Sequence, residues 1–280
     1  MGTELIARGL RVRAESPEAW NLERPDDVRA VHAAYIAAGA DAIQTNTFGG
    51  TRPRLARFGK QDQQRPLLLA AVRLAREAAA GRLVIGSLGP TGENLPLERG
   101  ADTGGVEDAY AEAAAILAEG GIDLLHLETL FHPLELELAV RGARRGAPSV
   151  PLVASMTLMP GVTGLETPHG VPLAKMLTAV RASEPDAVGV NCSIEGERML
   201  AAVEALREEV ALPVWAKPQA KISAKCVNGR SSETPEAFAR HAIALVRAGA
   251  SAIGGCCGVG PDSLAALRQA LDHTSARVAS

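Results

Sequence analysis

The chain has 280 residues, of which 47% are hydrophobic and 22% are charged, and this composition excludes an intrinsically disordered protein. Its 29 Lys and Arg residues against 32 Asp and Glu residues give a net charge of −3, and only 3% of residues are aromatic, so we expect no nucleic-acid partner. No apolar stretch approaches the roughly 20 residues of a membrane span, and the charged start of the chain lacks the apolar run of a secretory signal, which together predict a cytoplasmic protein without membrane association.

Short β-rich segments alternate with longer helical patterns along the chain, which is typical of repeated βα units on a parallel sheet. Seven strands are expected, at Asp41–Thr47, Leu83–Leu88, Ile122–Glu128, Val150–Met156, Asp186–Cys192, Leu212–Lys217 and Ser251–Cys256. Eight helical patterns lie between and around them, among them Asp27–Ala38, Pro235–Ala248 and Asp262–Leu271. Thr234 is expected to cap the second of these helices, because its hydroxyl can accept a hydrogen bond from the first turn.

This alternation predicts an α/β protein, a (β/α)₈ TIM barrel whose first strand is missing or truncated at the N-terminus. Eight helices with seven strands leave one strand unaccounted for, and we expect a complete version to carry about ten further residues before Met1. An open doubly wound sheet is the structural alternative, but Thr45–Gly50 is not a dinucleotide-binding loop. No linker divides the chain, so we expect one barrel over residues 1–273 and a short polar tail over 274–280.

Three of the four cysteines fall where an expected strand gives way to its loop. Cys192 ends one strand and Cys256 and Cys257 end the last, so a barrel would bring the three thiols together at its mouth. Three thiolates suit zinc and leave its fourth position open, as in catalytic sites. From spacing alone, Cys192 can instead be a small buried residue and the vicinal pair incidental. Cys226 matches no strand end and is interpreted as a bystander.

Glu128 ends the apolar segment that begins at Ile122, so its carboxylate is expected to face the mouth, where it could hold an ammonium group. It could also be a solvated charge or the partner of an arginine. His126 shares the same strand face and is interpreted as a packed core histidine rather than a ligand. The turn Gly86–Gly92 could cradle a phosphate, although a tight loop is the simpler interpretation.

These motifs together resemble the zinc-dependent homocysteine S-methyltransferases, most closely the homocysteine-binding barrel of cobalamin-dependent methionine synthase. The resemblance covers nearly the whole chain, and the cysteine motif near its end is highly specific. The segments that carry it are Met1–Leu5, Gly39–Asp41, Thr45–Phe48, Gly89–Glu93, Leu127–Thr129, Gly189–Cys192 and Gly254–Gly258.

The resemblance implies a (β/α)₈ barrel with one metal site and one substrate site. The implied Zn²⁺ ligands are Cys192, Cys256 and Cys257, and the implied substrate-binding residues are Glu128, which would hold the homocysteine amino group and act in catalysis, with Thr3, Asn191 and Gln219. The chain departs from the family in two places. It starts at the methionine of the family's Asp-Gly-Ala-Met-Gly-Thr motif, and Gln219 stands where the methionine synthase branch has an asparagine that can act as a stand-in zinc ligand.

The implied activity is methyl transfer to the thiol of L-homocysteine, giving methionine. Coordination to zinc deprotonates a thiol whose pKa is otherwise about 8.5, and this makes the nucleophile. A corrinoid or methylfolate system acting in trans is the expected methyl donor, with betaine and S-methylmethionine as alternatives. A non-catalytic zinc- or homocysteine-binding subunit is a second interpretation. A zinc hydrolase is disfavoured, because the His and carboxylate ligands of such sites do not cluster in the sequence.

Overall fold

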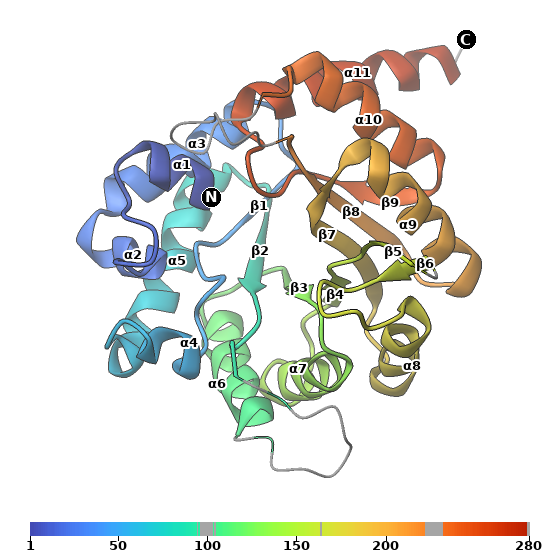
Figure 1. The fold of residues 1–280 in the computed structure, drawn as a ribbon. Helices are drawn as coiled ribbons and strands as arrows, with labels where there is room; N and C mark the ends of the chain where they lie inside the picture. The colour runs from blue at the N-terminus through green and yellow to red at the C-terminus, as the bar shows by residue number, and fades with distance from the viewer. Residues whose placement is uncertain (94, 96–102, 104, 163, 222–231, 279–280) are drawn as a thin grey trace.

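The structure, a computed structural model, describes residues 1–93, 95, 103, 105–162, 164–221 and 232–278. Its centre is a parallel sheet of seven strands that curls into a half-barrel, with the long helices on its outer side (Figure 1). In sheet order the strands are β1 (Ala42–Gln44), β2 (Leu83–Leu88), β3 (Leu124–Leu130), β4 (Leu152–Met156), β7 (Ala187–Glu195), β8 (Val214–Gln219) and β9 (Ala250–Ile253). The expected barrel-like α/β architecture is confirmed, with β1 and β9 as the two edges of the sheet.

Eight long helices match the expected number of helical patterns. They are α3 (Pro25–Ala37), α5 (Gln64–Ala79), α6 (Val106–Glu119), α7 (Pro133–Gly146), α8 (Leu173–Ser183), α9 (Gly196–Glu209), α10 (Pro235–Arg247) and α11 (Pro261–Val278). The described residues also form three short α-helices, two 3₁₀-helices and a hairpin that the sequence pattern does not predict. They are α1 (Gly2–Ala7), α2 (Trp20–Glu23), α4 (Arg52–Ala56), η1 (Pro17–Ala19), η2 (Gln61–Gln63), β5 (Met159–Gly161) and β6 (Gly164–Glu166). Helix α11 continues past Leu271, so the start of the expected polar tail is helical.

Local sequence explains the start of α10 and the burial of β4. Thr234 caps α10 as expected, because its hydroxyl accepts a hydrogen bond from the Ala237 amide at 3.2 Å. All residues of β4 are buried, as expected for a parallel strand with helices on one side and the barrel interior on the other. Among the helices of the described residues, none combines the length and the apolar character needed to cross a lipid bilayer.

Helices α6 and α7 pack closely because Gly142 has no side chain. A Cβ atom at this position would lie 2.3 Å from the Glu107 carbonyl oxygen, a backbone atom that cannot turn aside. We expect Gly142→Ala to lower the free energy of unfolding by about 1–3 kcal/mol, measured by urea denaturation, because overpacking outweighs alanine's better helix propensity. Gly2→Ala in α1, where an added Cβ meets nothing within 4 Å, is the matched control. A stability unchanged by Gly142→Ala would contradict this close approach.

Candidate functional site

The three cysteines from the strand ends form one cluster at the carboxyl end of the sheet. Cys192 lies in β7, and Cys256 and Cys257 lie in the loop that follows β9. Their sulfur atoms all lie within 4.8 Å of one another, and the Cys192 and Cys257 sulfurs are 3.8 Å apart. Sulfur atoms bound tetrahedrally about 2.3 Å from one zinc ion are separated by about 3.8 Å. The three thiols therefore fit a single ion of this kind, and the spacing is too long for a disulfide.

Irregular backbone aims these side chains. Cys192 has a φ of 65°, and the β7–β8 register shifts between Asn191 and Glu195, so β7 bulges at the cysteine. β3 has a similar bulge: Thr129 has a φ of 63°, and the β3–β4 register shifts between Leu127 and Leu130. Such strained backbone at the ends of β3 and β7, two strands that flank β4, is typical of functional sites.

Hydrogen bonds from β8 and α1 hold the loop of Cys256 and Cys257. The Cys256 amide donates to the Pro218 carbonyl at 2.9 Å, and the Cys257 carbonyl accepts from the Ala220 amide at 2.9 Å. The Thr3 hydroxyl accepts from the Gly258 amide at 2.9 Å, so Thr3, a predicted substrate contact, supports the cysteine loop.

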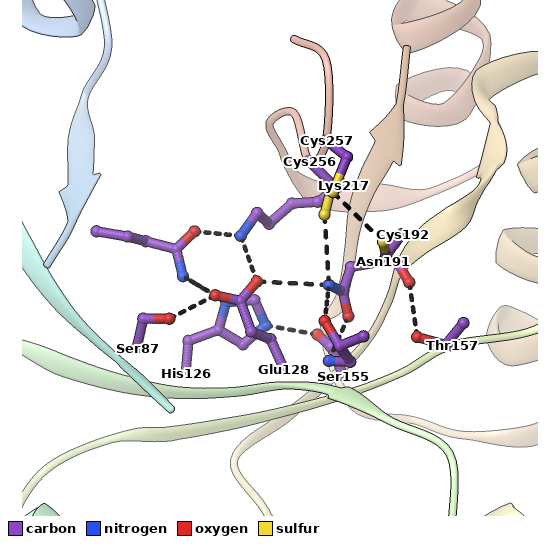
Figure 2. Close-up of polar contacts among 12 residues, drawn as sticks. Ser87, His126, Glu128, Ser155, Thr157, Asn191, Cys192, Lys217, Cys256 and Cys257 are labelled. Carbon is purple, nitrogen blue, oxygen red and sulfur yellow. Dashed lines mark hydrogen bonds and ion pairs between the residues drawn. The ribbon is translucent and has the colours of Figure 1, made fainter. Parts of the chain in front are cut away.

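Glu128 lies close to the thiols, in an ion pair with Lys217. The Lys217 ammonium donates to Glu128 Oε2 at 2.7 Å (Figure 2). It also donates to the Gln44 side-chain oxygen. Glu128 is only 6% exposed, so water screens this pair weakly. Burial pushes the pKa of Glu128 upward, but attraction to Lys217 and hydrogen bonds from Lys217 and Ser87 outweigh it and lower the pKa to about 2. Glu128 is therefore ionised and buried, so the interpretation as a solvated charge is wrong, and its ion-pair partner is a lysine rather than an arginine.

His126 lies one layer deeper in the barrel and is packed, as the sequence predicts. Its ring meets the Trp215 ring edge-on at 5.5 Å between centroids, and burial lowers its pKa to about 3. The neutral ring accepts a hydrogen bond at Nδ1 from Gln44 at 3.1 Å, which leaves Nε2–H to donate to the Ser155 hydroxyl at 2.6 Å. The Gln44 amide nitrogen also donates to Glu128, which confirms that His126 and Glu128 share one strand face.

Asn191 connects the carboxylate to the thiols. It is fully buried, and its Nδ2 contacts Glu128 Oε2 at 3.4 Å and Cys256 Sγ at 3.8 Å (Figure 2). Two further hydrogen bonds of 2.8 Å join its amide to the backbone and the hydroxyl of Thr129. One amide group therefore separates the carboxylate from the sulfur cluster.

Gln219 is the remaining described residue among those that the resemblance implies for the site. Gln219 ends β8 and is half-buried, two residues beyond Lys217. Cys226, interpreted as a bystander, lies outside the described residues. The turn Gly86–Gly92 is closed by the Phe48 ring, which would lie 2.3 Å from a Cβ at Gly89, as expected for a tight loop.

Burial and mutual hydrogen bonding raise the pKa values of the Cys256 and Cys257 thiols. The hydrogen bond with Cys192, together with burial, raises the pKa of Cys256 to about 11. The hydrogen bond with Cys192 lowers the pKa of Cys257, but that with Cys256, together with burial, outweighs it and raises the pKa to about 11. Soft sulfur donors that must lose protons together suit a thiophilic cation such as zinc.

Sequence patterns missed the residues that contact Glu128 or His126: Gln44, Ser87, Ser155 and Lys217. Lys217 carried a usable signal, because it is a charged residue inside the apolar strand β8, two positions after Trp215 and therefore on the same face. Gln44 and Ser87 gave no comparable signal.

A family model described as homocysteine S-methyltransferase matches residues 1–271. The chain belongs to the homocysteine S-methyltransferase family. The resemblance found in the sequence motifs is therefore confirmed. Two relatives are methionine synthases: the chain is 32% identical over 282 residues to that of Mycobacterium tuberculosis and 31% identical over 263 residues to that of Mycobacterium leprae. These matches cover 93% and 88% of this chain but only 23% and 21% of the relatives, so the chain spans less than a quarter of their length.

The present chain shares its fold with solved structures of the homocysteine methyltransferase MmuM from Escherichia coli, over most of both chains. The metallated form superposes with a TM-score of 0.76 at 28% identity, and the match covers 96% of this chain and 93% of that one. The oxidized form gives the same TM-score at 29% identity and the same coverage.

Proposed function

We propose that this chain transfers a methyl group to the thiol of L-homocysteine, giving methionine, with Zn²⁺ held by Cys192, Cys256 and Cys257. The observation that carries the proposal is the convergence of three thiols beside one buried carboxylate, in a chain of this family. The existence of a metallated form of the relative MmuM supports a bound metal in this chain. Zinc bound here would supply substrate thiolate at neutral pH.

The other residues bind and orient the substrate in this proposal. Glu128 holds the α-ammonium group by a charge-assisted hydrogen bond, and Asn191 fixes the distance between that carboxylate and the thiols. Because the Asn191 amide contacts both Glu128 and Cys256, the carboxylate and the thiols lie close together. This short separation matches homocysteine, in which three carbon atoms separate the sulfur from the ammonium group. Thr3 positions the cysteine loop, and Gln219 lies at the end of the same strand as Lys217.

A methyl donor outside residues 1–273, the proposed barrel, completes the reaction. A corrinoid or methylfolate system in trans is favoured by the similarity to methionine synthases, and betaine or S-methylmethionine are the alternatives. The free thiols require a reducing compartment, which supports a cytoplasmic location.

Methionine formation tests the proposed function. The zinc-loaded chain is incubated with homocysteine and, separately, with a methylcorrinoid protein, methylfolate, betaine or S-methylmethionine. Methionine with one donor supports the proposal and identifies the donor. Homocysteine binding without product from any donor would instead indicate a non-catalytic binding subunit.

We expect Glu128→Gln to weaken homocysteine binding roughly tenfold to a hundredfold while zinc content stays near one per chain, because a charge-assisted hydrogen bond is lost and no zinc ligand changes. Isothermal titration and elemental analysis measure the two effects. Ser87→Ala is the matched control, because it removes one hydrogen bond of 2.5 Å to the same carboxylate but keeps its charge. Equal losses of zinc and homocysteine in Glu128→Gln would place Glu128 in the metal site.

Chelation of the metal should remove activity and leave the fold intact. The three cysteines lie outside the hydrophobic clusters that stabilise the described chain, and a protein of this length buries enough apolar surface without a metal. We expect the far-ultraviolet circular dichroism to stay unchanged while activity falls to background and returns with zinc. Unfolding on chelation, as in zinc fingers, would show a structural metal site.

A further inference from the structure

The carboxylate proposed to hold the substrate ammonium already has a full set of donors. Glu128 Oε1 accepts hydrogen bonds from Ser87 at 2.5 Å and from Gln44 at 3.0 Å. Oε2 accepts from Lys217 at 2.7 Å and contacts the Asn191 amide at 3.4 Å. Because a carboxylate offers only about four acceptor positions, a substrate ammonium reaches Glu128 only by replacing one of these donors.

Lys217 is the donor that the site releases most easily. Ser87 is a short side chain on a strand, so it cannot leave without moving the backbone. Asn191 is also bound to Thr129, and the Gln44 amide nitrogen is also bound to His126, so their departure would break other hydrogen bonds. Lys217 has one other hydrogen bond, to the Gln44 side-chain oxygen. The Lys217 ammonium ends a flexible four-carbon stem and can swing away while its backbone stays in β8. Among the four donors it alone carries a positive charge, so a substrate ammonium can replace it without changing the charge next to Glu128.

Charge balance decides where the displaced ammonium goes. Homocysteine brings an ammonium and a carboxylate into a site where the side chains of Lys217 and Glu128 are only 12% and 8% exposed. If Lys217 stayed on Glu128, the substrate ammonium and carboxylate would both lack the partner that this ion pair can offer, and burying a charge without its partner is unfavourable. If the ions exchange, Glu128 pairs with the substrate ammonium, Lys217 pairs with the substrate carboxylate, and no charge is left alone.

We propose that Lys217 is a specificity-determining residue: its ammonium occupies the position of the substrate ammonium in the free site and moves to the substrate α-carboxylate on binding. The inference rests on the proposed function, since it takes homocysteine as the substrate. It restricts the substrate class to thiols that carry both charges of an α-amino acid.

The test compares ligands that lack one charge at a time. Isothermal titration measures the binding of L-homocysteine, of 3-aminopropane-1-thiol, which lacks the carboxylate, and of 4-mercaptobutanoic acid, which lacks the ammonium. The zinc-loaded chain, Lys217→Gln and the control Lys175→Gln are titrated with each. Lys175 is an exposed lysine of α8, away from the site.

The proposal predicts effects of opposite sign in Lys217→Gln. Homocysteine should bind roughly tenfold to a hundredfold more weakly, because its carboxylate loses a charged partner. The aminothiol should bind several-fold more tightly than it binds the unchanged chain, because no lysine has to be displaced from Glu128. Lys175→Gln should match the unchanged chain for all three ligands.

The proposal would be overturned if Lys217→Gln bound both homocysteine and 3-aminopropane-1-thiol more weakly than the unchanged chain does. Lys217 would then have a purely structural role. The proposal would also be overturned if homocysteine and 3-aminopropane-1-thiol differed in affinity for Lys217→Gln as much as they do for the unchanged chain, because another group would then bind the carboxylate. Failure of homocysteine to bind the unchanged zinc-loaded chain would instead refute the proposed function.

If Lys217→Gln does not fold, the neutral pair Glu128→Gln with Lys217→Gln replaces it and is compared with Glu128→Gln alone. The mercapto acid should bind more tightly to the single variant, which keeps the lysine. Equal affinities would contradict the proposed carboxylate contact.

Discussion

Replacing Cys256 by alanine should reduce the zinc content from about one per chain to near zero and abolish methyl transfer. The sulfur atoms of Cys192, Cys256 and Cys257 lie within 4.8 Å of one another, so Cys256→Ala removes one of three candidate zinc ligands. Replacing a residue that only hydrogen-bonds to a metal ligand typically lowers metal affinity by about 10–100-fold. Removing a ligating thiolate should therefore lower zinc affinity by more. Elemental analysis after dialysis and a methionine assay measure the two effects.

Cys192→Ala and Cys257→Ala should behave as Cys256→Ala does, and Cys226→Ala is the matched control. Circular dichroism should show the same helix content in all four variants. If Cys256→Ala or Cys192→Ala retained full zinc, or if Cys226→Ala lost it, the proposed metal site would be wrong.

Replacing Lys217 by methionine should lower the free energy of unfolding by about 3–5 kcal/mol, because it leaves the buried carboxylate of Glu128 without its cation. Methionine has a stem of similar length, so packing changes little. The double variant with Glu128→Gln should recover most of the loss, since no buried charge remains unpaired. Urea denaturation at about pH 7 of the unchanged chain, Lys217→Met, Glu128→Gln and the double variant gives a double-mutant cycle for this pair. Destabilisation that persists in full in the double variant would show that the lysine stem, rather than the charge pair, matters.

The effect of Lys217→Met should also depend on pH. Lys217 helps to lower the pKa of Glu128 from 4.5 to about 2. A depressed folded-state pKa contributes stability that is fully present above the unfolded value and is lost as the pH falls toward the folded value. The difference between the unchanged chain and the variant should therefore be largest above about pH 5 and shrink toward about pH 2. A constant difference across this window would exclude ionised Glu128 as its cause.

Local patterns in the sequence determined the main elements of the fold. The alternation of apolar strands and helical patterns predicted all seven parallel strands, because a two-residue period and a 3.6-residue period are properties of neighbouring residues. The same two-residue period placed His126 and Glu128 on one face of β3, and both contact Gln44. The cysteines were identified by their positions at strand ends, which in a parallel sheet lie on one edge.

Only the tertiary structure decided what these residues contact. The partner of Glu128 is Lys217, 89 positions away in the chain, and this pairing depends on the curl of the sheet, which brings β3 and β8 face to face across the barrel interior. The bulge at Cys192, with its φ of 65°, depends on a register shift against β8 that no local pattern encodes. Periodicity fixes which side of a strand a side chain occupies, whereas distances across the barrel follow from the packing and register of all the strands together.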